Sequence, residues 1–331
     1  MKNFKLISSI LKITLALVIT ILPTQSIVGQ DIDPIVLSKV SNGDIEATKK
    51  LLLDAGIDVK DEGSVSSTTQ KVLQTIIINA PSATIQSTIE KAVSSLTQAV
   101  FGLATAAELG PEETKAAVEA TAQGAIIAVV SEPSIKEANL SAAVAASSKS
   151  ATSGAMLAAS AAQQDTTATA VTVTEAAKAA TEGSMIGLTE LVKQNKPLSV
   201  IVYAVQAAAA GATQAATVTA VAVDADLAAI AIAVATSAET AADLKNKDKE
   251  TTDAVNAAVS SGVQQGTLAG ANDVGITGDA ATELAQDAQA AADEVALIDY
   301  DSEDSDTPVP VFTDTTADET ETASPSTGSN S

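Results

Sequence analysis

The side chains that could do chemistry in this chain are carboxylates, lysine ammonium groups and serine hydroxyls. The sequence has no histidine and no cysteine, and all 18 of its basic residues are lysine. Histidine bases, cysteine nucleophiles, His- or Cys-ligated metal sites and bidentate arginine clamps are therefore excluded. Neighbouring carboxylates occur at Glu112 and Glu113, Asp224 and Asp226, and Asp293 and Glu294. Adjacent helical residues point to different faces, so these pairs predict no two-carboxylate catalytic site.

Sequence motifs for catalysis are absent as well. There is no Gly-x-Ser-x-Gly elbow, no Ser-x-x-Lys set with partners and no phosphate-binding loop. Aromatic residues make up 2% of the chain, which disfavours the aromatic-lined clefts of glycosidases. The sequence therefore predicts a protein that is not an enzyme, with no catalytic residue, no cofactor and no small-molecule substrate.

Acidic residues outnumber basic ones by 41 to 18, which gives a net charge of −23. Such a charge argues against nucleic acid and anionic lipid as partners and leaves a protein partner or self-association. The acidic Ser/Thr/Pro-rich segment 299–331 is predicted to be a disordered, solvated tail. Its carboxylates are weak calcium candidates, because the spacing lacks the glycine and glutamate of an EF-hand. These candidates are Asp299, Asp301, Glu303, Asp304 and Asp306.

Residues 1–29 have the order of a secretory signal: Lys2 and Lys5 first, then an apolar run over 6–22, then small residues. The alternative is an uncleaved membrane anchor, which Lys12 within the apolar run disfavours. We therefore predict export, with the protein secreted, periplasmic or at the cell surface. Because the exported chain has no cysteine, its fold must be held together by packing alone.

Residues 81–298 are predicted to be an alanine-rich all-α body of about eight or nine antiparallel helices, arranged as a bundle or a solenoid-like stack. Alanine accounts for 58 of the 200 residues from 101 to 300, and it has the highest helix propensity. Breaks at Pro81, Pro111, Pro133 and Pro197 divide the region into helix-sized units. Two i, i+4 ladders of small residues indicate packed helix faces. They are Ala143, Ser147, Ala151, Ala155 and Ala159, and Ala225, Ala229, Ala233, Ser237 and Ala241.

Small residues also recur at intervals of 27 to 30 residues, which suggests one helix per interval. The centres are Gly124, Gly154, Gly183, Gly211, Ala238 and Gly266. Two groups of glycines, spaced four residues apart within each group, are predicted to allow close helix packing. These are Gly183 and Gly187, and Gly262, Gly266 and Gly270. Such glycines serve either membrane or oligomer contacts or tight packing inside a soluble stack, and the polar neighbours Asn272 and Asp273 favour the second.

The stretch 197–223 contains no charged residue. It is long enough to span a bilayer, but its glutamines, alanines and threonines make it only weakly apolar. A central helix buried on most sides explains the composition equally well and is the favoured interpretation.

The preceding segment, 30–80, is predicted to be helical and differs in composition. Gly43-Asp44-Ile45-Glu46 followed by Leu51-Leu52-Leu53 and Gly56 resembles the second half of an ankyrin repeat. One extra residue separates Glu46 from the leucines, and no second copy follows. A single repeat cannot bury its own faces, so we expect a helix that ends in a glycine turn and infer no ankyrin function.

These observations predict an exported, non-enzymatic structural or interaction protein of the cell surface, periplasm or extracellular matrix. The alternative is a helical protein that associates with membranes or oligomerises through the Gly262–Gly270 face. A third hypothesis is binding to ice or another ordered surface, because the composition resembles that of alanine-rich helical antifreeze proteins. Their 11-residue threonine spacing is not maintained across Thr166, Thr169, Thr172 and Thr174.

Overall fold

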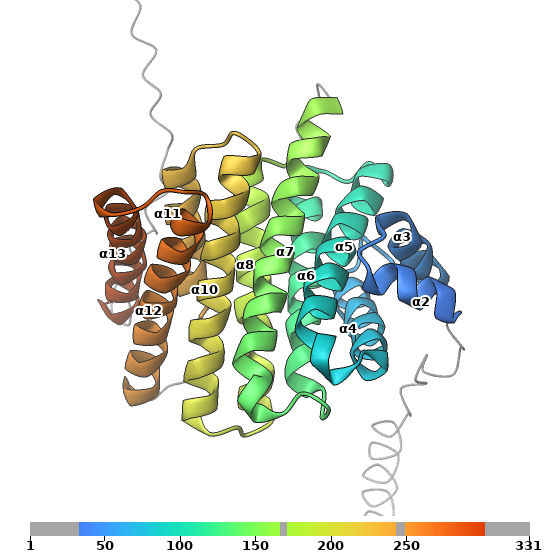
Figure 1. The fold of residues 1–331 in the computed structure, drawn as a ribbon, viewed down its shortest axis with the longest axis horizontal. Helices are drawn as coiled ribbons and strands as arrows, with labels where there is room; N and C mark the ends of the chain where they lie inside the picture. The colour runs from blue at the N-terminus through green and yellow to red at the C-terminus, as the bar shows by residue number, and fades with distance from the viewer. Residues whose placement is uncertain (1–32, 166–170, 243–248, 302–331) are drawn as a thin grey trace, which may run out of the picture.

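The computed structural model describes residues 33–165, 171–242 and 249–301, and this part of the chain is helical without strands. The predicted signal segment, 1–29, and most of the acidic segment 299–331 lie outside the described residues. The long helices lie side by side, with α2 and α3 at one end of the molecule and α12 and α13 at the other (Figure 1). The predicted all-α stack is confirmed.

The amino-terminal segment forms α2 (Pro34–Ser41), α3 (Ile45–Asp54) and α4 (Glu62–Asn79). The end of α3 is a glycine turn, as the sequence predicts. Gly56 has φ 78°, its N–H donates to Leu53 and the N–H of Ile57 donates to Leu52 at 3.1 Å. This is the Schellman pattern, which satisfies carbonyl groups that would otherwise be left without partners at the helix end.

Between 81 and 298 the described chain contains eight long helices and the short α9, in agreement with the predicted eight or nine. The 3-10 turn η2 (Ser82–Thr84) leads into the first of them. In chain order they are α5 (Ile85–Ala106), α6 (Pro111–Ser131), α7 (Glu137–Asp165), α8 (Val173–Gly187), α9 (Thr189–Lys193), α10 (Leu198–Ala222), α11 (Leu227–Ala241), α12 (Lys249–Asp273) and α13 (Asp279–Asp301).

Local chemistry places several of these helix starts. Pro111 occupies the first turn of α6, where its missing N–H costs nothing, and the Gly110 N–H donates to the Glu113 carboxylate. Thr172 and Glu175 form a reciprocal capping box at α8. Pro197 lies one residue before α10 and is its N-cap. The side chains of Glu113, Thr172 and Glu175 thereby satisfy backbone N–H groups at the starts of α6 and α8.

The chain alternates between two layers of helices. Layer A contains α3, α5, α7, α10 and α12, and layer B contains α4, α6, α8, α11 and α13. Within each layer, every helix packs against the one before it and the one after it, and consecutive helices of the chain pack across the layers. In Figure 1, α7 and α10 lie in front of α6 and α8. The repeating unit is thus a pair of helices, stacked as in a solenoid.

Glycines hold neighbouring helices of a layer close together. Gly262, Gly266 and Gly270 on α12 face Gln206, Ala210 and Gln214 on α10. Each step of four residues on one helix matches a step of four on the other, so α10 and α12 run in the same direction. A methyl group added at Gly266 would overlap the Ala210 carbonyl oxygen.

The same contact occurs along both layers. Added methyl groups at the glycine centres would overlap backbone carbonyl oxygens of the preceding helix in the layer. These contacts are Gly124 with Ser66, Gly154 with Ser94, Gly183 with Glu119, and Gly211 with Ala145. The predicted centres therefore lie where helices two elements apart in the chain meet. All six centres, including Ala238, are buried.

The two predicted alanine ladders differ in burial. The α7 ladder is fully buried, with Ala151, Ala155 and Ala159 each 0% exposed. In α11 the buried face is instead rotated towards Ile230 and Val234, and Ala229 is exposed. Small side chains fit either face of a helix, so the ladder alone does not determine which face packs.

Helix α10 is the uncharged stretch of the sequence. Among the described helices it is the one long and apolar enough to cross a bilayer, and 56% of its most apolar stretch is buried inside the molecule. It packs between α7 and α12 in layer A and against α8 and α11 behind. The interpretation as a central helix of the stack accounts for this burial.

If the glycine contacts limit the spacing of the helices, Gly183→Ala and Gly266→Ala will lower the free energy of unfolding by about 1–3 kcal/mol, as overpacking does. Gly102→Ala on α5 is the matched control, because its methyl would meet only the flexible Lys49 side chain, 3.0 Å from Cε. Better helix propensity should stabilise that variant by up to about 1 kcal/mol. Urea unfolding followed by circular dichroism measures all three. Stabilisation of all three variants would show that the glycine contacts do not limit the spacing of the helices.

Candidate functional site

The central helices of layer A are almost free of charge. Within α7, Lys149 is the one charged residue between 138 and 164. Helix α10 has no charged residue, and α12 has none between 254 and 272. By contrast, α13 of layer B has seven acidic residues and no lysine. A partner that contacts the middle of α7, α10 and α12 therefore meets little electrostatic repulsion.

A groove of about 300 Å³ crosses this face, and we call it the layer A groove. Small residues form its central part, and longer polar side chains stand around them. The lining comes from α5 (Gln86 and Glu90), α7 (Ala145, Ala146 and Lys149), α10 (Ala210, Gly211 and Gln214) and α12 (Gln265, Gly266 and Ala269). The small residues that bring the helices together thus also create the groove.

Hydrogen bonds hold the glutamines of the layer A groove. Gln214 donates to Asp273 at 2.7 Å, and Gln265 donates to Ser261 at 3.0 Å. Gln86 donates to Glu90 at 3.4 Å. Lys149 is half-buried, and no hydrogen bond or ion pair joins its ammonium group to the part of the chain that the structure describes. The groove thus contains amides held by hydrogen bonds, the Glu90 carboxylate and one ammonium group that has no partner among the described residues.

Exposed apolar side chains lie on the same helices. Tyr203 on α10 is 63% exposed, and Leu157, Val221 and Leu268 are also exposed. Tyr203 lies seven residues before Ala210, and Val221 lies seven residues after Gln214, which places both on the grooved side of α10. The face combines low charge, exposed apolar groups and fixed amides.

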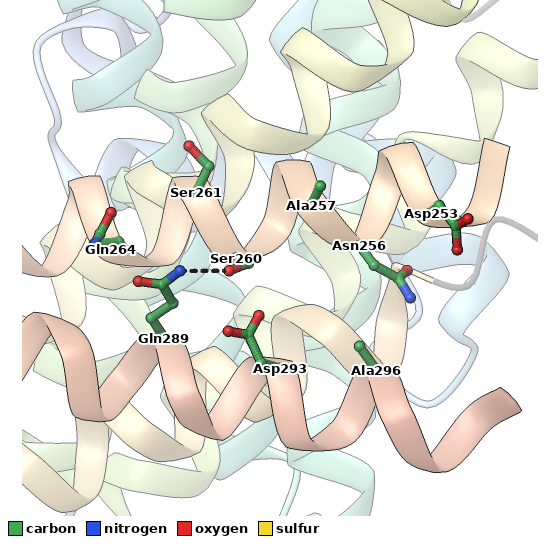
Figure 2. A pocket seen from close by; sticks show the side chains of 9 residues that line it. All are labelled: Asp253, Asn256, Ala257, Ser260, Ser261, Gln264, Gln289, Asp293 and Ala296. Atoms are coloured by element: carbon green, nitrogen blue, oxygen red, sulfur yellow. Dashed lines mark hydrogen bonds between the residues drawn. The ribbon is translucent and has the colours of Figure 1, made fainter. Parts of the chain in front are cut away.

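A second groove, of about 520 Å³, lies between α12 and α13. Figure 2 shows Asp293 pointing from α13 towards α12, and Gln289 reaching Ser260. That hydrogen bond measures 3.0 Å. Asp253 lies farther along α12, and Asn256 and Gln264 add amides. The Ser260 hydroxyl accepts an amide N–H, and no lysine lines the groove, so the lining offers polar contacts without an activated nucleophile.

A cluster of carboxylates crosses layer B. Glu62, Glu119 and Glu182 lie on α4, α6 and α8, which are neighbours in the layer. Burial raises the pKa of Glu119 above its ordinary value of 4.5, and the charges of Glu182 and Glu62 raise it further, whereas Lys115 lowers it. Glu182 also accepts a hydrogen bond from Ser237 on α11 at 3.0 Å. The cluster joins four helices of layer B.

The structure describes the glycines predicted for helix packing but not the side chains predicted as weak calcium ligands. Gly183, Gly187, Gly262, Gly266 and Gly270 all face a neighbouring helix of the same chain. The calcium candidates are not assessed, because the side chains of Asp299 and Asp301 and all of Glu303, Asp304 and Asp306 lie outside what the structure describes. Among the described residues, no three acidic side chains form a group that could hold a metal ion.

Sequence reasoning missed the polar residues of the layer A groove. Gln86, Lys149, Gln214 and Gln265 are far apart in the chain, and no motif connects them. The available signal was the scarcity of charge around Lys149 in α7, throughout α10 and in the middle of α12. The comparisons with protein-family models, curated proteins and solved structures find no match for this chain.

We expect the Glu119→Gln variant to be more stable than the wild type at pH 7 and no more stable below about pH 4. A raised pKa means that the folded state favours protonated Glu119. The stabilisation that protonated Glu119 provides is therefore complete below pH 4.5. It is lost as the pH rises through the raised pKa of the folded state. Urea unfolding at both pH values measures this. Glu283→Gln, on α13, controls for the change in net charge, and a pH-independent effect of Glu119→Gln would contradict the expectation.

Proposed function

We propose that this chain is an exported, non-enzymatic interaction or structural protein that acts at the cell surface, in the periplasm or in an extracellular matrix. In this proposal the two-layer stack is a rigid scaffold, and the grooved face of layer A is the surface that meets a protein partner. The observation that carries the proposal is the near-absence of charge across the middle of α7, α10 and α12, on a chain whose net charge is −23.

Physical reasoning supports a protein partner for this face. Exposed Tyr203, Leu157 and Leu268 can be removed from water by a partner, and uncharged amides can be desolvated at lower cost than carboxylates or lysines. Depletion of charge with an exposed tyrosine is typical of the central part of a protein interface.

The alternative is a role in membranes or oligomers through the glycine face of α12. In this fold that face is covered by α10 of the same chain, because Gly262, Gly266 and Gly270 meet Gln206, Ala210 and Thr217. An oligomer built on this face would require α10 to move away. The scaffold is therefore the function that we favour.

Photo-crosslinking tests which face meets the partner. Benzoylphenylalanine placed at Tyr203 should form adducts with another protein when the chain is produced in its own cells. The matched control is Ile78 on α4, which is 65% exposed and belongs to layer B. We expect adducts from position 203 at least about fivefold above those from position 78. Equal labelling, or no adduct from position 203, would contradict the proposal.

A further inference from the structure

We propose that the layer A groove binds an extended peptide segment that carries a carboxylate group. This rests on the proposed function, since it names the chemistry of the partner at the grooved face. Four features support it: the small residues of the groove, the unused hydrogen-bonding groups of its glutamines, the ammonium group of Lys149 and the length of the face.

The small residues allow a main chain to approach closely. Ala145, Ala210, Gly211, Gly266 and Ala269 line the groove with no more than a methyl group each. A peptide backbone can therefore lie near the helices without clashing with long side chains. No aromatic ring lines the groove, so it lacks the stacking surface that would suit a sugar or a nucleobase.

The glutamine side chains of the groove carry N–H donors and C=O acceptors that can pair with those of a peptide backbone. Each glutamine amide has two N–H donors and one carbonyl acceptor. In Gln214 and Gln265 one hydrogen bond to Asp273 or Ser261 holds the amide in place, and in the described part of the chain the amide oxygen accepts none. Each amide therefore keeps an N–H and a C=O that can pair with the C=O and N–H of an extended chain.

Lys149 determines the charge of the partner. Its ammonium group is half-buried among amides and methyl groups, whereas Glu90 at the α5 end already accepts from Gln86. All four ion pairs of the described residues lie within single helices, and Lys149 is in none of them. A partner that brings a carboxylate would supply the missing charge, and a charge-assisted hydrogen bond in a partly desolvated groove is a strong one.

The face has the length of a short peptide. The groove crosses four helices that are neighbours in layer A. Packed helices lie about 8 Å apart at the close end of their range, so three spacings give roughly 24 Å. An extended chain rises about 3.3 Å per residue, so seven or eight residues cover that distance.

A displayed library of random dodecapeptides, selected on the exported form of the chain, tests this inference. We expect the selected peptides to contain Asp or Glu. Lys149→Gln should weaken their binding about tenfold or more, the size of effect expected for one charged hydrogen bond. Lys149→Arg should keep most of the affinity. Lys178→Gln is the matched control, because Lys178 is another half-buried lysine without a partner in the described structure, but on α8 of layer B.

Three results would overturn the inference: no selected peptides, peptides without acidic residues, or binding that Lys149→Gln leaves unchanged. A dimer of the exported chain that is lost in Lys149→Gln, measured by sedimentation, would also overturn it by assigning the groove to a second copy. Adducts from position 203 together with any of these results would leave the interaction scaffold in place and reject only the acidic peptide. Failure of both experiments would reject the proposed function as well.

Discussion

The packing in the middle of both layers depends on carbonyl oxygens of one helix lying where the next helix of the layer has no side chain. Ser66, Glu119, Ala145 and Ala210 present such oxygens to glycines. Alanine and glycine bury little apolar area, so this stack cannot rely on large side chains alone. Close approach adds dispersion and weak Cα–H···O contacts along each helix pair. Glycine costs about 1 kcal/mol of helix propensity, which these contacts must offset.

The same constraint determines where charge can lie. Helices that approach closely on both sides have few positions left for long side chains, and α10, between α7 and α12, has no charged residue at all. Polar contacts between these helices are therefore made by short or neutral groups. The Ser148 hydroxyl donates to the Ala208 carbonyl at 2.9 Å, and Thr219 donates to Ser153 at 3.1 Å. Apart from Lys149, the charged residues of α7 and α12 lie near the ends of these helices.

Much of the fold could be predicted from the sequence, because helix propensity and proline breaks are local signals. Pro111, Pro133 and Pro197 lie between helices or at their first residue, and the glycine centres lie at helix contacts. The pairing of helices could not be predicted, because alanine faces are nearly interchangeable, as the exposed Ala229 in α11 shows. The layer A groove could not be predicted for the same reason. Lys149 and Gln214 become neighbours only once α7 and α10 are paired.

The uncharged helix α10 and the glycine face of α12 pack against each other within the chain. Flotation of residues 30–331 with vesicles of neutral phosphatidylcholine, at low and high salt, tests whether this packing holds in the presence of lipid. We expect the protein to remain at the bottom of the gradient and to show a helical circular dichroism spectrum. Flotation that is independent of salt would show that α10 and the glycines enter lipid instead of packing against each other.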